Sequence, residues 1–409
     1  MRICWVTTSF PRFVGDHSAT FLLTLAKHLV RKGVDLTIVA PHEGGLPEEE
    51  TLEGVRVCRF VYWLPRRSQA LAYGHGIPDN IRRNPSVGLQ VPPFLASAAL
   101  KVLSMARGAD VLHGFWTPSA FLAVPAKKRY GIPLVTTLLG SDIRNGPKTV
   151  NRIALHFSDA VVCATEEMAA YLRTYPVKVP VFDVKQTNLV DPDRLRSGDS
   201  LEPDLLEWIG KGSALITLVA RLVDFKDPVG FVHAMPYILQ EHPGTRFLII
   251  GDGPLFEPLE TLIRSMNLTS CARLTGHRTD IGSFLERSTV FVANSPVSNC
   301  YSCAVLEAMS AGVPCVLTDA GDPRGTFRGY VELARPRDPR SLAQAVNTLL
   351  SDEEQRRHRA ATSRQFLLDL GFGSEVVLRQ TMEIYEALRR DPKLPDRLSI
   401  PRVDLSPGI

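Results

Sequence analysis

The sequence predicts an α/β protein made of two Rossmann-like domains that face each other across a cleft. Three observations support this. Short apolar strands alternate with amphipathic helical segments through both halves of the chain, which is typical of stacked βαβ units. The 409 residues exceed what one ordinary core supports. A stretch rich in Pro, Asp, Gly and Ser, at residues 188–212, separates the two series, and ligands of such folds bind at the carboxyl ends of the strands.

The first domain is expected at residues 1–190. A helix is indicated where apolar residues at 22, 25, 26 and 29 follow helical spacing up to Gly33. Strands are expected at residues 3–7, 36–40, 110–113, 133–137 and 160–163. Residues 63–93, rich in Pro, Gly and Arg, are interpreted as a long insertion or loop near the open end of the sheet.

The second domain is expected at residues 213–372, after a linker at 191–212. Its predicted strands are residues 215–220, 247–250, 272–275, 290–292 and 314–317. A last amphipathic pattern at 375–388 predicts a C-terminal helix, and we expect residues 373–409 to cross back onto the first domain. The Pro-rich tail from 391 is expected to be irregular.

Composition limits the function classes. A net charge of +4 over the whole chain does not argue for nucleic acid, and the dispersed Arg pairs leave only peripheral contact with anionic lipid open. Seven cysteines lack a full metal-binding framework and are interpreted as reduced thiols of a cytoplasmic protein. The chain starts with a strand rather than a secretory signal. No run approaches the roughly 18 apolar residues of a spanning helix, so any membrane contact is expected to be peripheral.

The most informative motif is Arg221 and Lys226, five residues apart in the loop after strand 215–220. Asp227 is a candidate N-cap and Pro228 a candidate first residue of the next helix, so the backbone N–H groups of its first turn are expected to face the same pocket. Two cations beside a helix N-terminus suit a diphosphate. The alternative is a pair of solvated loop cations.

Two glycine loops follow in the same half. Gly251 and Gly253 come directly after strand 247–250, where they form half of a dinucleotide fingerprint or a tight βα turn. Gly276, His277 and Arg278 follow the strand at 272–275, and this loop could offer backbone groups to a nucleobase; His277 itself is given no chemical role.

Glu307 lies in a helix that starts near Ser302, among apolar neighbours. A buried carboxylate needs a partner, and either a ribose diol or an internal Arg satisfies it. In the first half, Gly15 and Asp16 precede a helix at the expected cleft. Asp142 is either an N-cap or a hydroxyl acceptor there, and His113 is either a cleft side chain or a core histidine.

These motifs together resemble family-4 retaining glycosyltransferases of the GT-B fold, closely in the second half and more loosely in the first. The resemblance implies a sugar transferred from a nucleoside-diphosphate donor, UDP- or GDP-type, to a hydroxyl acceptor (a sugar, a lipid-linked molecule or a small molecule) with retention and without metal or other cofactor. It implies that Arg221 and Lys226 hold the diphosphate, with Gly251 and Gly253 also on the donor side. It implies further that the Gly276–Arg278 loop holds the base and Glu307 the ribose, with Ser302 nearby. The Gly15 loop would approach phosphate and acceptor, with Asp16, His113 and Asp142 on the acceptor side.

Two positions depart from the family pattern. Asn299 stands where the family usually has the first of two glutamates, and Leu139 where many members have histidine. An amide at 299 still hydrogen-bonds a sugar hydroxyl but carries no negative charge. Two alternatives therefore stay open: a nucleotide-sugar epimerase or isomerase on the same scaffold, and a nucleotide-sugar-binding protein with weakened catalysis.

Overall fold

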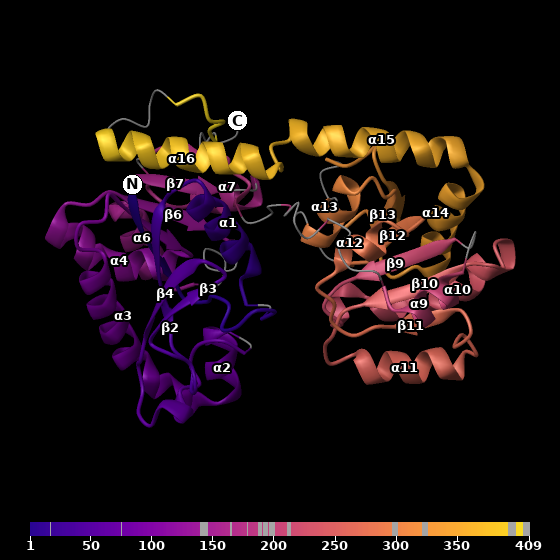
Figure 1. Cartoon of the computed structure of the whole chain (residues 1–409), viewed down its shortest axis with the longest axis horizontal. Coiled ribbons are helices and arrows are strands. Elements are labelled where there is room, and N and C mark those ends of the chain that lie inside the picture. Colours follow the sequence, from indigo (N-terminus) through magenta and orange to yellow (C-terminus); the bar gives the residue numbers. More distant parts are fainter. Residues whose placement is uncertain are drawn as a thin grey trace. The chain divides into compact units, whose positions relative to one another are not determined.

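The chain forms two compact units (Figure 1): Met1–Leu189 with Glu375–Ile409 (unit 1), and Val190–Ser374 (unit 2). The computed structural model describes residues 1–16, 18–74, 76–139, 146–163, 166–177, 179–186, 190, 195, 201–210, 214–296, 302–320, 326–391 and 398–403. Within the segment expected as a linker lies α9 (Pro203–Ile209), whose Leu205 and Ile209 are buried in a core cluster of unit 2.

Unit 1 contains a mostly parallel sheet of order β3-β4-β2-β1-β5-β6-β7-β8, in which only the β3–β4 pair is antiparallel among the described strands. Its strands are β1 (Arg2–Thr7), β2 (Asp35–Pro41), β3 (Glu49–Leu52), β4 (Val55–Phe60), β5 (Val111–Phe115), β6 (Leu134–Leu138), β7 (Ala160–Cys163) and β8 (Val181–Phe182). Side chains alternate across β1: Ile3 and Trp5 enter one core, Cys4 and Val6 the other. The sheet is therefore covered on both faces, as parallel sheets require.

The helices of unit 1 divide between these faces. α1 and α16 pack with Ile3 and Trp5, whereas α3 and α4 pack with Cys4 and Val6. The helices are α1 (Thr20–Arg31), η1 (Arg66–Ser68), α2 (Ile77–Arg83), η2 (Pro85–Gln90), α3 (Val91–Met105), α4 (Thr117–Tyr130), α6 (Lys148–Phe157), α7 (Glu166–Leu172) and α16 (Ser374–Arg390). The C-terminal helix thus belongs to the core of the unit that begins the chain.

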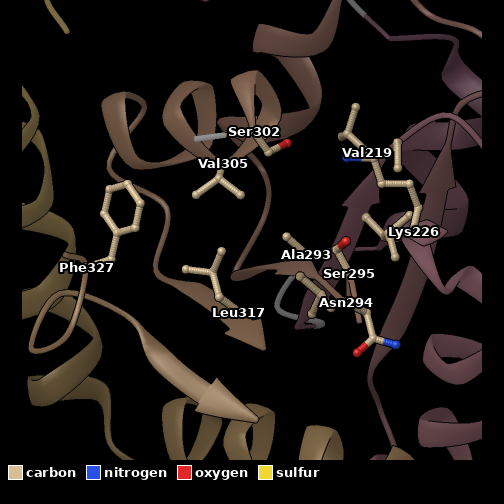
Figure 2. A pocket seen from close by; sticks show the side chains of 12 residues that line it. Val219, Lys226, Ala293, Asn294, Ser295, Ser302, Val305, Leu317 and Phe327 are labelled. Carbon is tan, nitrogen blue, oxygen red and sulfur yellow. The ribbon is translucent and has the colours of Figure 1, made fainter. Parts of the chain in front are cut away.

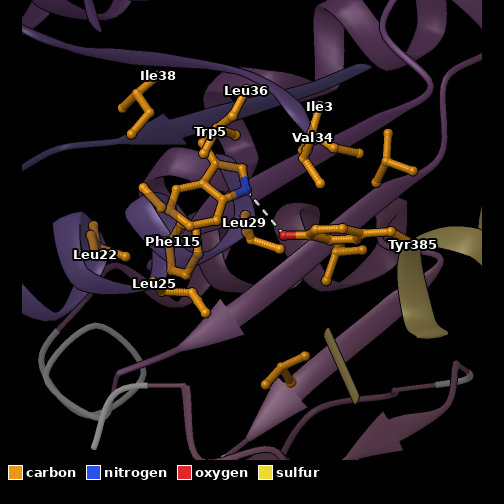
Figure 3. Close-up of a cluster of buried hydrophobic side chains, with 14 of the residues drawn as sticks. Ile3, Trp5, Leu22, Leu25, Leu29, Val34, Leu36, Ile38, Phe115 and Tyr385 are labelled. Atoms are coloured by element: carbon orange, nitrogen blue, oxygen red, sulfur yellow. Dashed lines mark hydrogen bonds between the residues drawn. The ribbon is translucent and has the colours of Figure 1, made fainter. Parts of the chain in front are cut away.

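A buried chain of hydrogen bonds joins α16 to the sheet. Trp5 Nε1–H donates to the Tyr385 hydroxyl at 3.0 Å (Figure 3), and that hydroxyl contacts His113 Nδ1. His113 Nε2 lies 2.6 Å from Thr137 Oγ1, which donates to Gln186 Oε1, and Gln186 Nε2 donates to Thr381 of α16. Since the Thr137 proton goes to Gln186, His113 donates from Nε2. Burial lowers the pKa of His113 to about 3, so the imidazole is neutral at pH 7 and Nδ1 accepts from the Tyr385 hydroxyl.

Unit 2 contains a parallel sheet of order β11-β10-β9-β12-β13-β14, the doubly wound order of Rossmann folds. Its strands are β9 (Leu215–Val219), β10 (Arg246–Ile250), β11 (Ala272–Leu274), β12 (Val290–Ala293), β13 (Cys315–Thr318) and β14 (Glu332–Ala334). Its other helices are η4 (Asp224–Lys226), α10 (Pro228–Glu241), α11 (Phe256–Ser265), α12 (Ile281–Leu285), α13 (Cys303–Ser310), α14 (Pro339–Ser351) and α15 (Glu353–Asp369).

Two expectations about the first half are wrong. Residues 63–93 are not simply a loop, because they contain η1, α2, η2 and the start of α3. A helical stretch long and apolar enough to cross a membrane also exists by length and composition: Pro85–Met105 has 21 residues and a mean hydropathy of 1.3 over its best window. The prolines at 85, 92 and 93 obscured it, since Pro is tolerated in first turns of helices.

His113→Gln tests the buried network through pH. Burial lowers the pKa of His113 to about 3 from an ordinary 6.5. The unfolded chain therefore binds a proton below pH 6.5 that the folded chain does not, and wild type should lose about 1.4 kcal/mol of stability per pH unit from His113 as pH falls from 6.5 towards 3.

Denaturant unfolding between pH 7 and about pH 4 measures this slope, which should be smaller in His113→Gln. The exposed His156→Gln is the matched control and should keep the wild-type slope. Equal slopes for wild type and His113→Gln would contradict the assignment.

Candidate functional site

The strand order of unit 2 places a ligand site at one edge of its sheet. The strand order reverses between β9 and β12, because β10 and β11 are added on one side of β9 and β12 to β14 on the other. Ligands of open α/β sheets bind at the carboxyl ends of the strands at such a switch point. A hollow lies there (Figure 2), lined by Leu218, Val219 and Ala220 at the end of β9 and by Val292, Ala293, Asn294 and Ser295 at the end of β12. Lys226, Ser302, Val305, Leu317 and Phe327 complete its described lining. The fold therefore brings Lys226 to the expected place.

Arg221 and Lys226 both lie against one aromatic ring. Arg221 Cζ lies 5.5 Å and Lys226 Nζ 5.7 Å from the centroid of Phe225, within range of a cation–π contact. Burial lowers the pKa of Lys226, and the charge of Arg221 lowers it further against an opposing effect of Cys303. Arg221 is exposed while Lys226 is partly buried in the hollow. Two like charges near each other favour an anion between them.

The helix start after Lys226 is as expected, with one difference. Asp227 is the N-cap of α10 and accepts from Gly230 N–H at 3.0 Å, and Pro228 opens the helix. Asn294 Nδ2 donates to Asp227 Oδ2 at 2.9 Å, which ties the cap to the end of β12. The Gly230 N–H is thus already used. By contrast, Ser302 does not cap α13 with its side chain, and Ser302 and Val305 line the hollow. The helix N-terminus that faces the hollow is that of α13.

Gly251 and Gly253 lie against the backbone of the loop that carries Arg221. A Cβ on Gly251 would stand 1.9 Å from Ala220 O, and one on Gly253 2.6 Å from Leu222 O; both have positive φ, 143° and 151°. Leu222 N–H donates to Asp252 O at 2.8 Å, and Leu255 N–H donates to Leu222 O at 3.1 Å. The two glycines allow a close approach of loops. Their contact with a donor stays a prediction.

The loop after β11 is hydrogen-bonded to the glycine turn at Gly251. Gly251 N–H donates to Gly276 O at 2.8 Å, and His277 is exposed. The Arg278 guanidinium pairs with Asp280 and Glu202, each at 2.6 Å. These pairs raise the pKa of Arg278 and occupy its donors within unit 2. Arg278 therefore has a structural role, and base binding by this loop stays a prediction.

Glu307 lies in α13 and is 4% exposed, among the apolar residues Val305, Leu306 and Met309. It is buried as expected, but it is not among the described residues that line the hollow. Asn299 falls outside the described residues. The ribose contact of Glu307 and the sugar contact of Asn299 stay predictions.

In unit 1, the loop before α1 is held by Asp16 rather than left open for a substrate. Asp16 accepts from Arg12 N, Nε and Nη2 at 2.9, 2.7 and 3.1 Å, and from Ser18. Burial alone would raise its pKa, but the bonds from Arg12 lower it to about 2. Both carboxylate oxygens are engaged, so Asp16 has a structural role in this loop, and its expected acceptor-side role stays a prediction. Gly15, next to it, is exposed with open space beside it.

The other acceptor-side candidates do not form a site in the described residues. His113 is 0% exposed, and both its ring nitrogens are used in the network to α16, so its expected acceptor-side role is wrong. Asp142 falls outside the described residues. His113 is therefore a core histidine, which was the other alternative that the sequence left open.

Sequence reasoning missed several residues that build these loops. Phe225 and Asn294 position Lys226 and Asp227, and Ser295 Oγ donates to Phe225 O at 2.7 Å. In unit 1, Arg59 is fully buried, pairs with Glu50, and donates to Pro11 O at 2.7 Å and to the Tyr73 hydroxyl at 3.0 Å. Nothing in the local pattern of these residues marks contacts with loops so distant in the chain.

Within the ranges that the structure describes, no group of three or more His, Cys, Asp or Glu stands ready to hold a metal ion. Six cysteines in these ranges are free thiols: Cys4, Cys58, Cys163, Cys271, Cys303 and Cys315.

Two family models match the two halves of the chain. Residues 18–182 match "Glycosyltransferase Family 4" and residues 208–366 match "Glycosyl transferases group 1", together about four fifths of the sequence. The chain belongs to glycosyltransferase family 4. The resemblance noted from the Arg221 and glycine motifs is thus confirmed.

Individual relatives agree with this. The glycosyltransferase is 26% identical to N-acetyl-alpha-D-glucosaminyl L-malate synthase of Bacillus anthracis over 74% of this chain and 82% of that enzyme. It is 32% identical to an Escherichia coli UDP-Gal:alpha-D-GlcNAc-diphosphoundecaprenol alpha-1,3-galactosyltransferase over 55% of each. Among solved structures, Anabaena HepE in complex with UDP-glucose matches with a TM-score of 0.68 and 17% identity, over 95% of this chain and 100% of that one. These matches show a GT-B glycosyltransferase with two Rossmann-like units.

Gly251→Ala tests whether the glycine turn braces the cation loop. Its Cβ would overlap Ala220 O at a positive φ, so the loop or the turn must shift, and we expect unit 2 to lose about 2–3 kcal/mol of stability. Gly244→Ala is the matched control, because nothing lies within 4 Å of its Cβ, and it should be neutral. Urea unfolding measures both. An unchanged midpoint for Gly251→Ala would show that the approach is looser than described.

Proposed function

We propose that this glycosyltransferase moves a sugar from a nucleoside-diphosphate donor to a hydroxyl acceptor, with retention at the anomeric carbon and without a metal ion. The observation that carries the proposal is the pair of cations, Arg221 and Lys226, at the carboxyl end of β9, where Lys226 lines a hollow beside the α13 N-terminus.

The chemistry follows from charge. As the bond between the anomeric carbon and the phosphate oxygen breaks, negative charge gathers on the departing diphosphate. A guanidinium, an ammonium and the α13 N-terminus would stabilise that charge at fixed positions, which is the task a divalent cation performs elsewhere. The acceptor oxygen then bonds to the anomeric carbon from the same face, and its proton passes to the departing phosphate.

The partial burial of Lys226 suits this role. Its lowered pKa arises mainly from burial and further from the charge of Arg221, and a bound diphosphate would offset this lowering by supplying an opposite charge. Lys226 can therefore bind the diphosphate most strongly when negative charge builds up on it during transfer. UDP is the first donor nucleotide to test, because HepE was solved with UDP-glucose and the E. coli relative is named for UDP-Gal.

The acceptor is proposed to be a sugar, lipid-linked or small-molecule hydroxyl that meets unit 1. The printed name of the E. coli relative includes a diphosphoundecaprenol acceptor, which supports the lipid-linked class. We also propose that the reaction occurs in the cytoplasm, which the free thiols of the described cysteines support.

Arg221→Ala and Lys226→Ala test the diphosphate site. Each removes charge-assisted hydrogen bonds to phosphate, so calorimetry should show UDP binding weakened about 10- to 100-fold in each variant. Arg264→Ala is the control: this exposed arginine of α11 pairs with Glu260 and should leave binding unchanged. Wild-type affinity in both Arg221→Ala and Lys226→Ala would contradict the site.

Product stereochemistry tests the reaction itself. With a nucleotide-sugar donor and a suitable acceptor, NMR of the product should show the anomeric configuration of the donor, and the rate should be unchanged by EDTA. An inverted product would contradict retention, and loss of activity in EDTA that Mg²⁺ restores would contradict metal independence.

A further inference from the structure

Helix α3 of unit 1 is largely apolar but only partly covered. Phe94, Ala98 and Val102 are buried in a core cluster on one face. A polar stripe of Ser97, Lys101 and Ser104 runs along one flank, where Lys101 pairs with Glu49. The face opposite the core carries Leu89 of η2, 69% exposed, and Leu100, 67% exposed, with Pro92 and Ala96 at helical spacing between them. Apolar helix surface is normally buried, yet only 28% of the apolar window in Pro85–Met105 is.

The apolar surface continues past the helix. A hollow of about 570 Å³ beside α3 is lined by Val61, Tyr62, Trp63 and Leu64 before η1, by Arg66 of η1, and by Pro93 and Ser97 of α3. Leu64 is 74% exposed. Exposed apolar patches of this kind mark interaction sites.

Basic residues flank α3 at both ends. Residues 61–105 contain five Arg or Lys and one acidic residue, Asp79. Arg66, Arg67, Arg82 and Arg83 are exposed near the start of the helix, where Glu48 pairs with Arg66 and Asp79 with Arg82. At the other end, Arg107, Lys128 and Arg129 are exposed, and the Tyr130 hydroxyl donates to Leu103 O, which ties the end of α4 to α3. Figure 1 shows α3 beside α4.

Charge and shape favour one occupant. An aliphatic face with arginines at its ends matches the interface of an anionic bilayer, where apolar side chains enter the acyl boundary and cations meet the headgroups. The length of Pro85–Met105 would suffice for a span, but Phe94, Ala98 and Val102 already belong to the unit 1 core. A helix with one face in the core can therefore lie on a membrane surface but not span it.

We propose that the exposed face of η2 and α3, with Leu64 beside it, docks unit 1 onto the surface of an anionic lipid bilayer. This goes beyond the transfer reaction and does not depend on it. Docking would hold the acceptor half of the enzyme where a lipid-linked hydroxyl is concentrated.

The experiment is flotation of the full chain with phosphatidylcholine vesicles, with and without phosphatidylglycerol, at low and high salt. Wild type should float with the anionic vesicles and less so at high salt. The double variant Leu89→Glu with Leu100→Glu should lower binding at least about tenfold, since it places two carboxylates at the acyl boundary. Arg82→Glu with Arg83→Glu should remove the preference for anionic vesicles.

Leu368→Glu, on α15 of unit 2 and 46% exposed, is the matched control and should float like wild type. A thermal shift with UDP, run on each variant, reports folding and the donor site separately from docking. No binding by wild type, or equal binding by the Leu89/Leu100 variant, would overturn the proposal. So would sedimentation showing a dimer that this variant dissolves without any vesicle binding, because a second copy would then cover the face.

Discussion

The donor half depends on how closely three loops approach one another at the carboxyl edge of its sheet. The backbone of Ala220 to Leu222 lies so near Gly251 and Gly253 that a methyl group at either glycine would overlap a carbonyl oxygen. Hydrogen bonds from Leu222 to Asp252 and from Gly251 to Gly276 fasten the three loops together. This close packing fixes the loop from which Arg221 and Lys226 project, so the cations are placed before any ligand arrives, and little reorganisation remains for binding.

Unit 1 achieves the same rigidity with buried polar groups. An ion pair between Arg12 and Asp16 closes the loop after β1, and the buried Arg59 donates a hydrogen bond to Pro11 O of the same loop. The chain from Trp5 through Tyr385 and His113 to Thr381 binds the C-terminal helix to the central strands. Such networks are stable because each donor has an acceptor. Several titratable residues of unit 1 are therefore committed to holding the fold.

The sequence predicted the repeating strand and helix patterns but not the individual contacts between residues that are far apart in the chain. Alternating strands and helices predicted both sheets, and the Asp227–Pro228 cap was found because capping is encoded locally. α3 was missed because its prolines resemble loop signals. Asp16 and His113 were assigned to the acceptor side from their positions near strand ends. Those positions do not reveal a hydrogen-bond partner far along the chain, such as Tyr385 for His113. Phe225 and Arg59 were missed for the same reason, since their partners come from other loops.

We propose that a nucleoside diphosphate binds at the end of β9 beside both cations, and a crystal structure of the full chain with UDP is the decisive test. The phosphate oxygens should lie within hydrogen-bond distance of both Arg221 and Lys226, beside the start of α13 and in the hollow bounded by Asn294 and Ser302. Diphosphate density elsewhere on unit 2, with Arg221 and Lys226 still turned only towards Phe225, would contradict it.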